Sequence, residues 1–388
     1  MSITQRVSMN NNLKDNSINV IKKTTDKQRR NYGIDLLRII SMINIINLHI
    51  NLKTGIMRLK AINLKYKTIW RLEIFSYNAV DCFGLISGIV GFNKYKFSNL
   101  IYLWFISAFY SVTINAYLFI ENKINLKQLF ISFFPILIKF HWYVNAYFIM
   151  YLFLPFINYG IKLLNVKTFR NLVFFYIFFF SIYYIVSFSG IKNYSFLLNG
   201  YSSSWLTILY IIGSYFGKYI LENINKSNKL FKCFYLINYI SFSFLTSEIF
   251  FITRKYTLIN YLSPTILFQA LSLVMFFNSI KITNKHIIKI ITFITPMVFS
   301  VTLIHLKIFS LKLKIVLSLF GTIKRLNNRF LFFKIYFLST IIFLLCLLID
   351  FFRLSLFQIL RIRKICIFTE TIFPKIFDFV LSTKKLLI

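Results

Sequence analysis

The chain has 388 residues, of which 57 % are hydrophobic and 15 % are charged, and its net charge is +35. A soluble protein with this composition would expose large apolar patches to water, so a soluble enzyme, a disordered chain and a secreted disulfide scaffold are excluded. The basic residues lie mostly in short segments between apolar runs, which is typical of membrane-helix flanks beside anionic lipid and not of a nucleic-acid-binding surface. The composition predicts a polytopic membrane protein whose surroundings are the lipid bilayer, with no nucleic-acid partner.

The predicted elements begin with a polar, basic segment, residues 1–32, which we expect to be a cytoplasmic N-terminal tail. Ten apolar runs of about 20 residues follow, each long enough to cross a bilayer as a helix. They cover roughly residues 34–52, 72–93, 98–119, 143–161, 171–189, 203–222, 231–252, 262–281, 289–309 and 330–351. The predicted fold is therefore all-α, with about ten transmembrane helices in one domain that spans residues 33–352.

The distribution of Lys and Arg sets the expected orientation. A modest excess of basic residues lies in the segments that face the cytoplasm when the N-terminus is inside. Residues 353–388 are basic and apolar together, which predicts an amphipathic C-terminal tail on the inner leaflet. We therefore expect a multi-pass protein of the inner, cytoplasmic membrane with both termini in the cytoplasm.

Ionisable side chains inside the first span are the main functional signal, because such groups are costly in a membrane. Arg38 and His49 are eleven positions apart, which places them on one helix face and about 16 Å apart along its axis. An arginine at one end can hold an anionic phosphate, while the histidine acts as base or nucleophile on a group carried by a long arm such as pantetheine. In the alternative interpretation, Arg38 pairs with Asp35 and His49 only contacts a neighbouring helix.

Other spans contain motifs that accompany the arginine–histidine spacing of the first span. The second span reads AVDCFGLISGIVGF and contains Phe83, Ser87 and Gly88 in a Phe-x-x-x-Ser-Gly pattern. The fourth reads HWYVNAYFIMYLFLPFIN, and the ninth reads TPMVFSVTLIHL and includes His305. Together with the spacing of arginine, ten residues and histidine in the first span, these stretches resemble the membrane-bound acyltransferase family 3. The resemblance covers about residues 31–360.

The resemblance implies a membrane-bound O-acyltransferase of the acetyl or succinyl type. The donor would be a cytoplasmic acyl-CoA, with acetyl-CoA the favoured one, and the acceptor a hydroxyl of a cell-envelope polysaccharide or glycolipid. Arg38 and Ser87 are the predicted donor-binding residues, although Ser87 could equally serve helix packing. His49, Asp81 and His305 are the predicted catalytic residues, and Asp81 could instead be a structural carboxylate. No metal site is predicted, because no zinc-type spacing is present.

The rival interpretation is transport, as a polysaccharide exporter or flippase of the cell envelope, with a glycan polymerase as a more distant third. A transporter is expected to place polar groups in many spans. In this chain the ionisable groups within the membrane cluster in the first two spans. This clustering favours a localised chemical site.

Overall fold

A computed structural model describes residues 30–54, 57, 63–92, 94–138, 141–182, 197–221, 229–310 and 330–372. Within these ranges the chain forms helices and turns and contains no strand, which confirms the all-α prediction. The predicted N-terminal tail lies outside the described residues except for its last three positions, and residues 373–388 of the predicted C-terminal tail also lie outside them.

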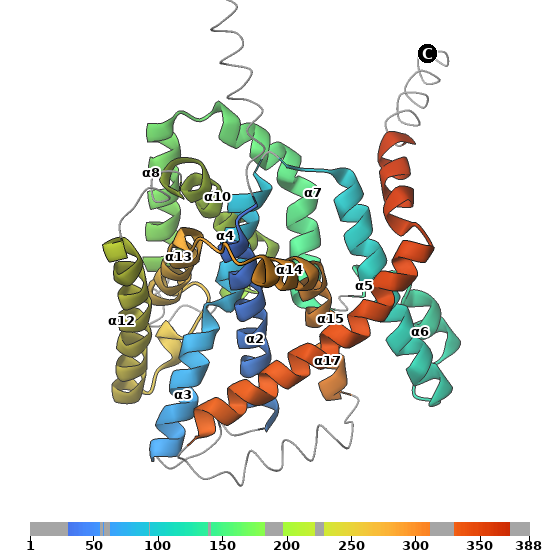
Figure 1. The fold of residues 1–388 in the computed structure, drawn as a ribbon, viewed down its shortest axis with the longest axis horizontal. Helices are drawn as coiled ribbons and strands as arrows, with labels where there is room; N and C mark the ends of the chain where they lie inside the picture. The colour runs from blue at the N-terminus through green and yellow to red at the C-terminus, as the bar shows by residue number, and fades with distance from the viewer. Residues whose placement is uncertain are drawn as a thin grey trace, which may run out of the picture.

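The α-helices pack into a bundle, and α2 and α4 lie near its centre (Figure 1). Their bounds are α2 Tyr32–Thr54, α3 Leu64–Tyr77, α4 Ala79–Gly91, α5 Phe97–Ile120, α6 Leu126–Ile131, α7 Trp142–Leu163, α8 Val166–Tyr176, α10 Ser203–Tyr215, α12 Lys229–Thr253, α13 Pro264–Ser279, α14 Lys285–Ile294, α15 Val298–Ser310 and α17 Leu331–Ile359. π-Helical turns extend α8 over Ile177–Ile182 and α10 over Phe216–Ile220. Short 3-10 helices occupy Leu198–Gly200, Tyr256–Leu258 and Thr295–Met297.

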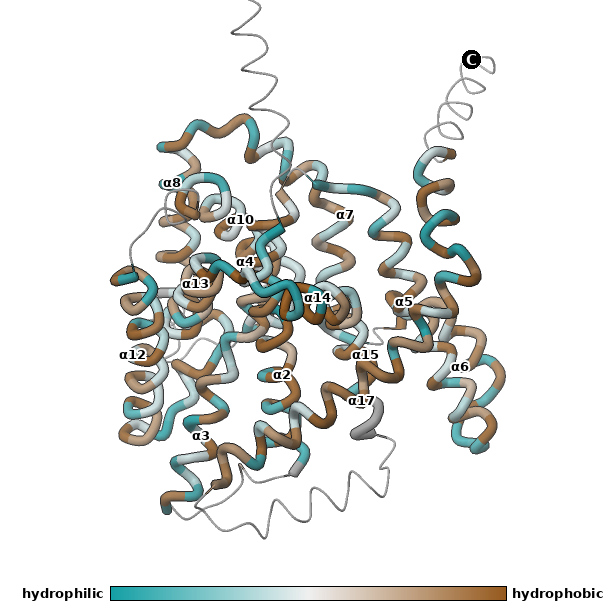
Figure 2. The backbone as a smooth tube through the Cα atoms, in the orientation of Figure 1, coloured by the Kyte–Doolittle hydropathy of each residue, from teal (hydrophilic) through white to brown (hydrophobic). Residues whose placement is uncertain are grey.

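Helical residues occupy most of the described part of each of the ten predicted spans, although residues 183–189 of the fifth lie outside the described residues and the second covers the end of α3 as well as α4. Seven helical segments of the described chain are long and apolar enough to cross a membrane, so the chain is a multi-pass membrane protein. Most of their length is hydrophobic (Figure 2). The other three predicted spans coincide with α8, α10 and α13, of which α8 and α10 end in π-helical turns and α13 has only 16 residues. The count of about ten spans therefore stays a prediction.

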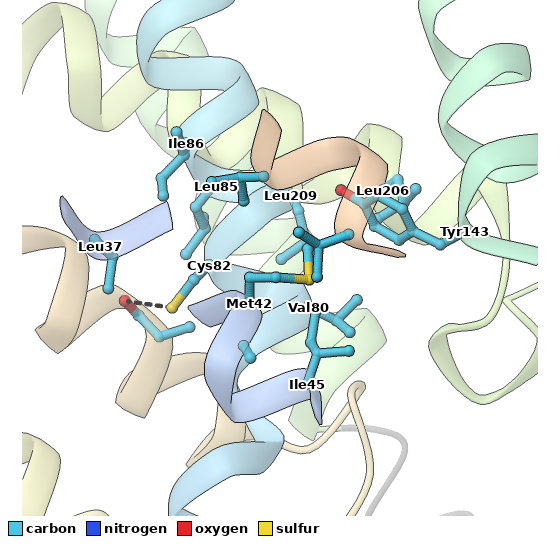
Figure 3. Packing of buried hydrophobic residues seen from close by; sticks show 14 of the residues in the cluster. Leu37, Met42, Ile45, Val80, Cys82, Leu85, Ile86, Tyr143, Leu206 and Leu209 are labelled. Atoms are coloured by element: carbon cyan, nitrogen blue, oxygen red, sulfur yellow. Dashed lines mark hydrogen bonds between the residues drawn. The ribbon is translucent and has the colours of Figure 1, made fainter. Parts of the chain in front are cut away.

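The most extensive contact between two helices joins α4 to α10, and it includes the glycines Gly88 and Gly213. A Cβ atom on Gly88 would lie 2.0 Å from the Tyr210 carbonyl oxygen, and one on Gly213 would lie 2.1 Å from the Leu85 carbonyl oxygen. Small residues at both positions let the two backbones approach, as in other membrane helix pairs. Leu85 of α4 and Leu209 of α10 belong to the same buried cluster (Figure 3), so the site is built on a tightly packed pair.

Polar side chains fasten α17 to α2, which it crosses obliquely in Figure 1. The Tyr336 hydroxyl donates to Asn44, and the Ser339 hydroxyl donates to Asn47. Hydrogen bonds between polar side chains add to van der Waals packing between membrane helices. The two asparagines of the first span thus position the helix that carries Arg38 and His49.

The helix α17 continues to Ile359, beyond the domain boundary predicted at residue 352. Arg353, which begins the predicted surface tail, is only 1 % exposed. Its guanidinium forms two hydrogen bonds to Asp350, at 2.7 and 2.8 Å, and Tyr110 donates to the same carboxylate. A paired and hydrogen-bonded charge can be buried where an isolated one could not. The chain turns at Arg361, and a last described helix covers residues 362–372.

Candidate functional site

A cavity of about 750 Å³ lies between the central helices, and both Arg38 and His49 of α2 line it. This agrees with their eleven-residue spacing, which places them on one face about 16 Å apart. We call the two parts of the cavity the Arg38 end, which also includes Lys94 and Arg363, and the His49 end, which also includes Glu73.

His49 is in direct contact with His305, the histidine of the ninth predicted span. Nδ1 of His49 lies 3.0 Å from Nε2 of His305, and Nδ1 of His305 lies 2.6 Å from the Val301 carbonyl oxygen. His305 is fully buried, whereas His49 lines the cavity. The structure therefore brings together two of the three predicted catalytic residues, across 256 positions of sequence.

The Val301 carbonyl assigns the hydrogen positions of this pair. A carbonyl oxygen only accepts, so Nδ1 of His305 must carry the hydrogen that it donates. With both rings neutral, Nε2 of His305 is then an acceptor, and Nδ1 of His49 donates to it. This tautomer leaves Nε2 of His49 with a free lone pair, which can take a proton or attack a carbonyl carbon.

Arg38 pairs with Asp35, as the alternative interpretation of the sequence proposed. Nη1 of Arg38 lies 2.5 Å from one carboxylate oxygen of Asp35, and Nε of Arg30 lies 2.6 Å from the other. The pair does not remove Arg38 from the cavity, because its side chain is 24 % exposed and forms part of the cavity lining. A guanidinium has five N–H donors, so Arg38 can bind Asp35 and an anion at the same time.

Ser87 and Asp81 are placed differently, although both belong to α4. Ser87 lines the cavity beside Tyr147 of α7 and donates to the Phe83 carbonyl oxygen at 2.8 Å. Asp81 is completely buried and accepts a hydrogen bond from the Trp205 indole at 3.1 Å. It is not among the residues that line the cavity. Ser87 thus lies near the other site residues, whereas Asp81 contacts α10 instead of a histidine or arginine.

Glu73 is a site residue that the sequence reasoning missed. It lines the His49 end, is 6 % exposed, and accepts a hydrogen bond from Asn51 at 2.8 Å. The signal was present, because a carboxyl group inside an apolar run is the same feature that singled out Asp81. Asn51 lies two positions after His49, so α2 itself holds this carboxyl group near the histidine pair.

Aromatic rings surround the His49 end in three close pairs. The ring centroids are 4.6 Å apart for Trp142 and Tyr201, 4.7 Å for Tyr77 and Tyr261, and 5.4 Å for Trp70 and Tyr256. All six rings line the cavity. Because several separate elements contribute these rings, sequence periodicity alone could not bring them together. We call these six residues the aromatic cluster.

His141, the residue before α7, also lines the cavity and interacts electrostatically with His305. No sequence pattern predicts that His141 lies near the ninth span. Within the described part of the chain, no group of three or more His, Cys, Asp or Glu side chains is arranged to hold a metal ion. The described site offers a histidine pair, an arginine, a carboxyl group and aromatic rings.

The arrangement of a histidine and an arginine in one intramembrane cavity defines a candidate site for group transfer. A family model for an acyltransferase domain matches residues 31–349, which include α2 and the first 19 residues of α17. The chain belongs to acyltransferase family 3 and is an acyltransferase of that family. No curated protein and no solved structure matches the chain.

Proposed function

We propose that the protein is an O-acyltransferase of the acetyl or succinyl type. It moves the acyl group from a cytoplasmic acyl-CoA, with acetyl-CoA the favoured donor, to a hydroxyl of a cell-envelope polysaccharide or glycolipid. The observation that carries this proposal is the single cavity that connects Arg38 to His49 over about 16 Å. That separation suits a donor whose phosphates and reactive thioester lie at opposite ends of a pantetheine arm.

The two ends of the cavity have different roles in this proposal. Arg38 holds a phosphate of the donor, and Ser87 and Tyr147 contact the arm between the two ends. The thioester then reaches His49. With the N-terminus in the cytoplasm, the Arg38 end opens to the cytoplasmic donor and the His49 end to the acceptor on the other side of the inner membrane.

The histidine tautomer supports a specific step. Nε2 of His49 takes the proton of the acceptor hydroxyl, and the hydroxyl oxygen attacks the thioester carbonyl carbon. The C–S bond breaks, and the thiolate of CoA leaves and is protonated. Alternatively, Nε2 attacks the thioester first and carries the acyl group until the hydroxyl displaces it. In both forms His305 orients the reacting ring.

The aromatic cluster supports a sugar as the acceptor. The flat faces of sugar rings carry C–H groups that pack against aromatic faces, whereas their edges carry hydroxyls that need polar partners. Glu73 provides such a partner among the aromatic rings. The His49 end therefore offers both kinds of contact beside the proposed catalytic nitrogen.

Mass spectrometry of envelope glycans tests the proposal. Cells that produce the wild-type protein should carry glycan with the mass increment of one acetyl or one succinyl group per modified sugar. Cells that produce His49→Gln at the same membrane level should carry the same glycan without that increment. If His49→Gln or deletion instead removes the glycan from the surface while its acylation is unchanged, the exporter interpretation replaces this proposal.

A further inference from the structure

The last described helix, residues 362–372, begins beyond the family match, which ends at residue 349, yet it packs against the site. The Glu370 carboxylate accepts a hydrogen bond from the Phe97 amide at 2.9 Å, at the first residue of α5. A hydrogen bond from Ser98 is the main reason that the pKa of Glu370 lies below its usual value. A negative charge at a helix N-terminus is favourable, so Glu370 anchors the C-terminal helix to α5.

Arg363 projects from this helix onto α5 and lines the Arg38 end of the cavity. It donates to the Asn99 side chain at 2.7 Å, and its guanidinium carbon lies 4.9 Å from the centre of the Tyr102 ring. The Tyr102 hydroxyl accepts a hydrogen bond from the buried Arg353 at 3.3 Å. The position of Arg363 is therefore fixed by contacts that themselves rest on the buried ion pair of α17.

A series of neighbouring side chains leads from Arg363 toward Arg38. The Asn99 amide donates to the Tyr151 hydroxyl at 3.3 Å, and the Tyr151 ring is 6.1 Å from that of Tyr147, which interacts electrostatically with Arg38. Tyr151 also packs against Tyr95, which follows Lys94 in the sequence. All of these residues line the cavity. Three cations from separate segments thus line the same cavity as the partly exposed Tyr95 and Tyr151.

We propose that Arg38, Lys94 and Arg363 form a polyphosphate site, in which Arg363 binds the 3′-phosphate of a coenzyme A donor. This inference rests on the proposed acyl-CoA function and adds a residue from outside the family match. Several separated cations suit a ligand with several separated phosphates, because each guanidinium can bind one phosphate through two hydrogen bonds. Arg38 and Lys94 bind the pyrophosphate, and Tyr95 and Tyr151 offer ring faces to the adenine.

Binding measurements with two probes test the assignment without relying on catalysis. Calorimetry on the full-length protein in lipid nanodiscs compares CoA with 3′-dephospho-CoA, which lacks only the 3′-phosphate. Wild type should bind CoA more tightly. Arg363→Ala should lower the affinity for CoA about fivefold, which corresponds to the upper value of an exposed ion pair. Its affinity for 3′-dephospho-CoA should be the same as that of wild type. Lys364→Ala is the matched control, because Lys364 is an exposed neighbour that does not line the cavity.

A second control separates phosphate binding from helix docking. Glu370→Gln removes the negative charge but keeps an oxygen that can accept from the Phe97 amide, so Arg363 should stay in position and the preference for CoA over 3′-dephospho-CoA should not change. If Arg363→Ala lowers the affinity for both probes equally, or if Lys364→Ala or Glu370→Gln has the same effect, Arg363 does not bind the 3′-phosphate. The proposal of an acyl-CoA donor is not affected by that result. If wild type binds neither probe, the acyl-CoA donor of the proposed function fails, and this inference fails with it.

Discussion

The two ends of the cavity differ in charge and in burial, although one helix, α2, supplies Arg38 to one end and His49 to the other. At the His49 end, His305 is completely buried and the six rings of the aromatic cluster line the cavity. At the Arg38 end, the cation is partly exposed and shares Asp35 with Arg30. Electrostatic interactions are stronger in a buried, low-dielectric environment than beside solvent. In the proposed function, this difference suits the His49 end to chemistry and the Arg38 end to reversible binding of the donor.

This contrast gives each end its own kinetic signature. A change that removes an interaction made only in the transition state lowers kcat, whereas a change that removes substrate binding raises KM. Substitutions at the His49 end of α2 should therefore act on kcat, and those at the Arg38 end should act on the KM or Kd of the donor. The predictions below test this division, beginning with the largest expected effect.

The replacement of His49 by alanine should lower the rate of acyl transfer by about 10²- to 10⁴-fold, the usual cost of losing a general base. Donor binding should be nearly unchanged, because His49 is about 16 Å from Arg38 along α2. His49→Gln keeps a hydrogen-bonding side chain but cannot take a proton, so it should be equally inactive. The measurement is acylated glycan per unit of inserted protein, together with CoA affinity. Near-normal transfer by His49→Gln would remove the catalytic role.

Substitutions at the Arg38 end should change the affinity for the donor. Arg38→Ala removes a charge-assisted hydrogen bond and should weaken acyl-CoA binding by roughly 10- to 100-fold with a smaller change in kcat. Arg38→Lys keeps the charge but loses the planar fork, so its loss should be intermediate. Arg30→Ala is a matched control, because Arg30 contacts the same Asp35 but does not line the cavity. Equal donor affinity in all four proteins would leave Arg38 as a structural partner of Asp35.

Much of this division could be predicted from the sequence, because it depends on local periodicity. Eleven residues of α-helix place Arg38 and His49 on one face, and the apolar runs predict helices that the described residues of each run form. The ninth-span motif also singled out His305. These inferences use spacing within one segment or a motif within one span, so the unknown packing of distant helices did not affect them.

Contacts between distant segments could not be predicted in the same way. The hydrogen bond between His49 and His305 joins residues 256 positions apart. Nothing in either span specifies the length of this bond or the tautomers of the two rings. The sequence pattern places Arg353 in a basic surface tail, but in the structure Asp350 and the Tyr102 hydroxyl accept its hydrogen bonds, and Tyr110 donates to the same Asp350 carboxylate. Charge patterns predict exposure only when the charge has no buried partner, and that partner is a property of the three-dimensional fold.

His305 offers a test within the His49 end. If it acts by orienting the His49 ring, His305→Ala should lower kcat by about tenfold, the value of one neutral hydrogen bond, with the KM for both substrates unchanged. His305→Gln retains an oxygen that can accept from Nδ1 of His49, so it should recover most of the rate. Steady-state kinetics on membrane preparations measures both parameters. A His305→Gln variant as inactive as His49→Gln would mean that His305 itself transfers a proton.

The smallest effect is expected at the aromatic cluster, and it distinguishes the acceptor from the donor. Trp142→Ala removes one ring that contacts Tyr201 and lines the His49 end. An aromatic contact contributes about 0.5–1.5 kcal/mol, so the KM for unacylated glycan should rise by roughly two- to tenfold. The KM for acyl-CoA should not change, because the donor's phosphates lie at the other end. Trp104→Ala is the control, because Trp104 is a tryptophan of α5 that does not line the cavity. A rise in the donor KM alone would place the donor at the His49 end and reverse the two roles of the cavity, whereas equal effects of both tryptophans would show only a general loss of packing.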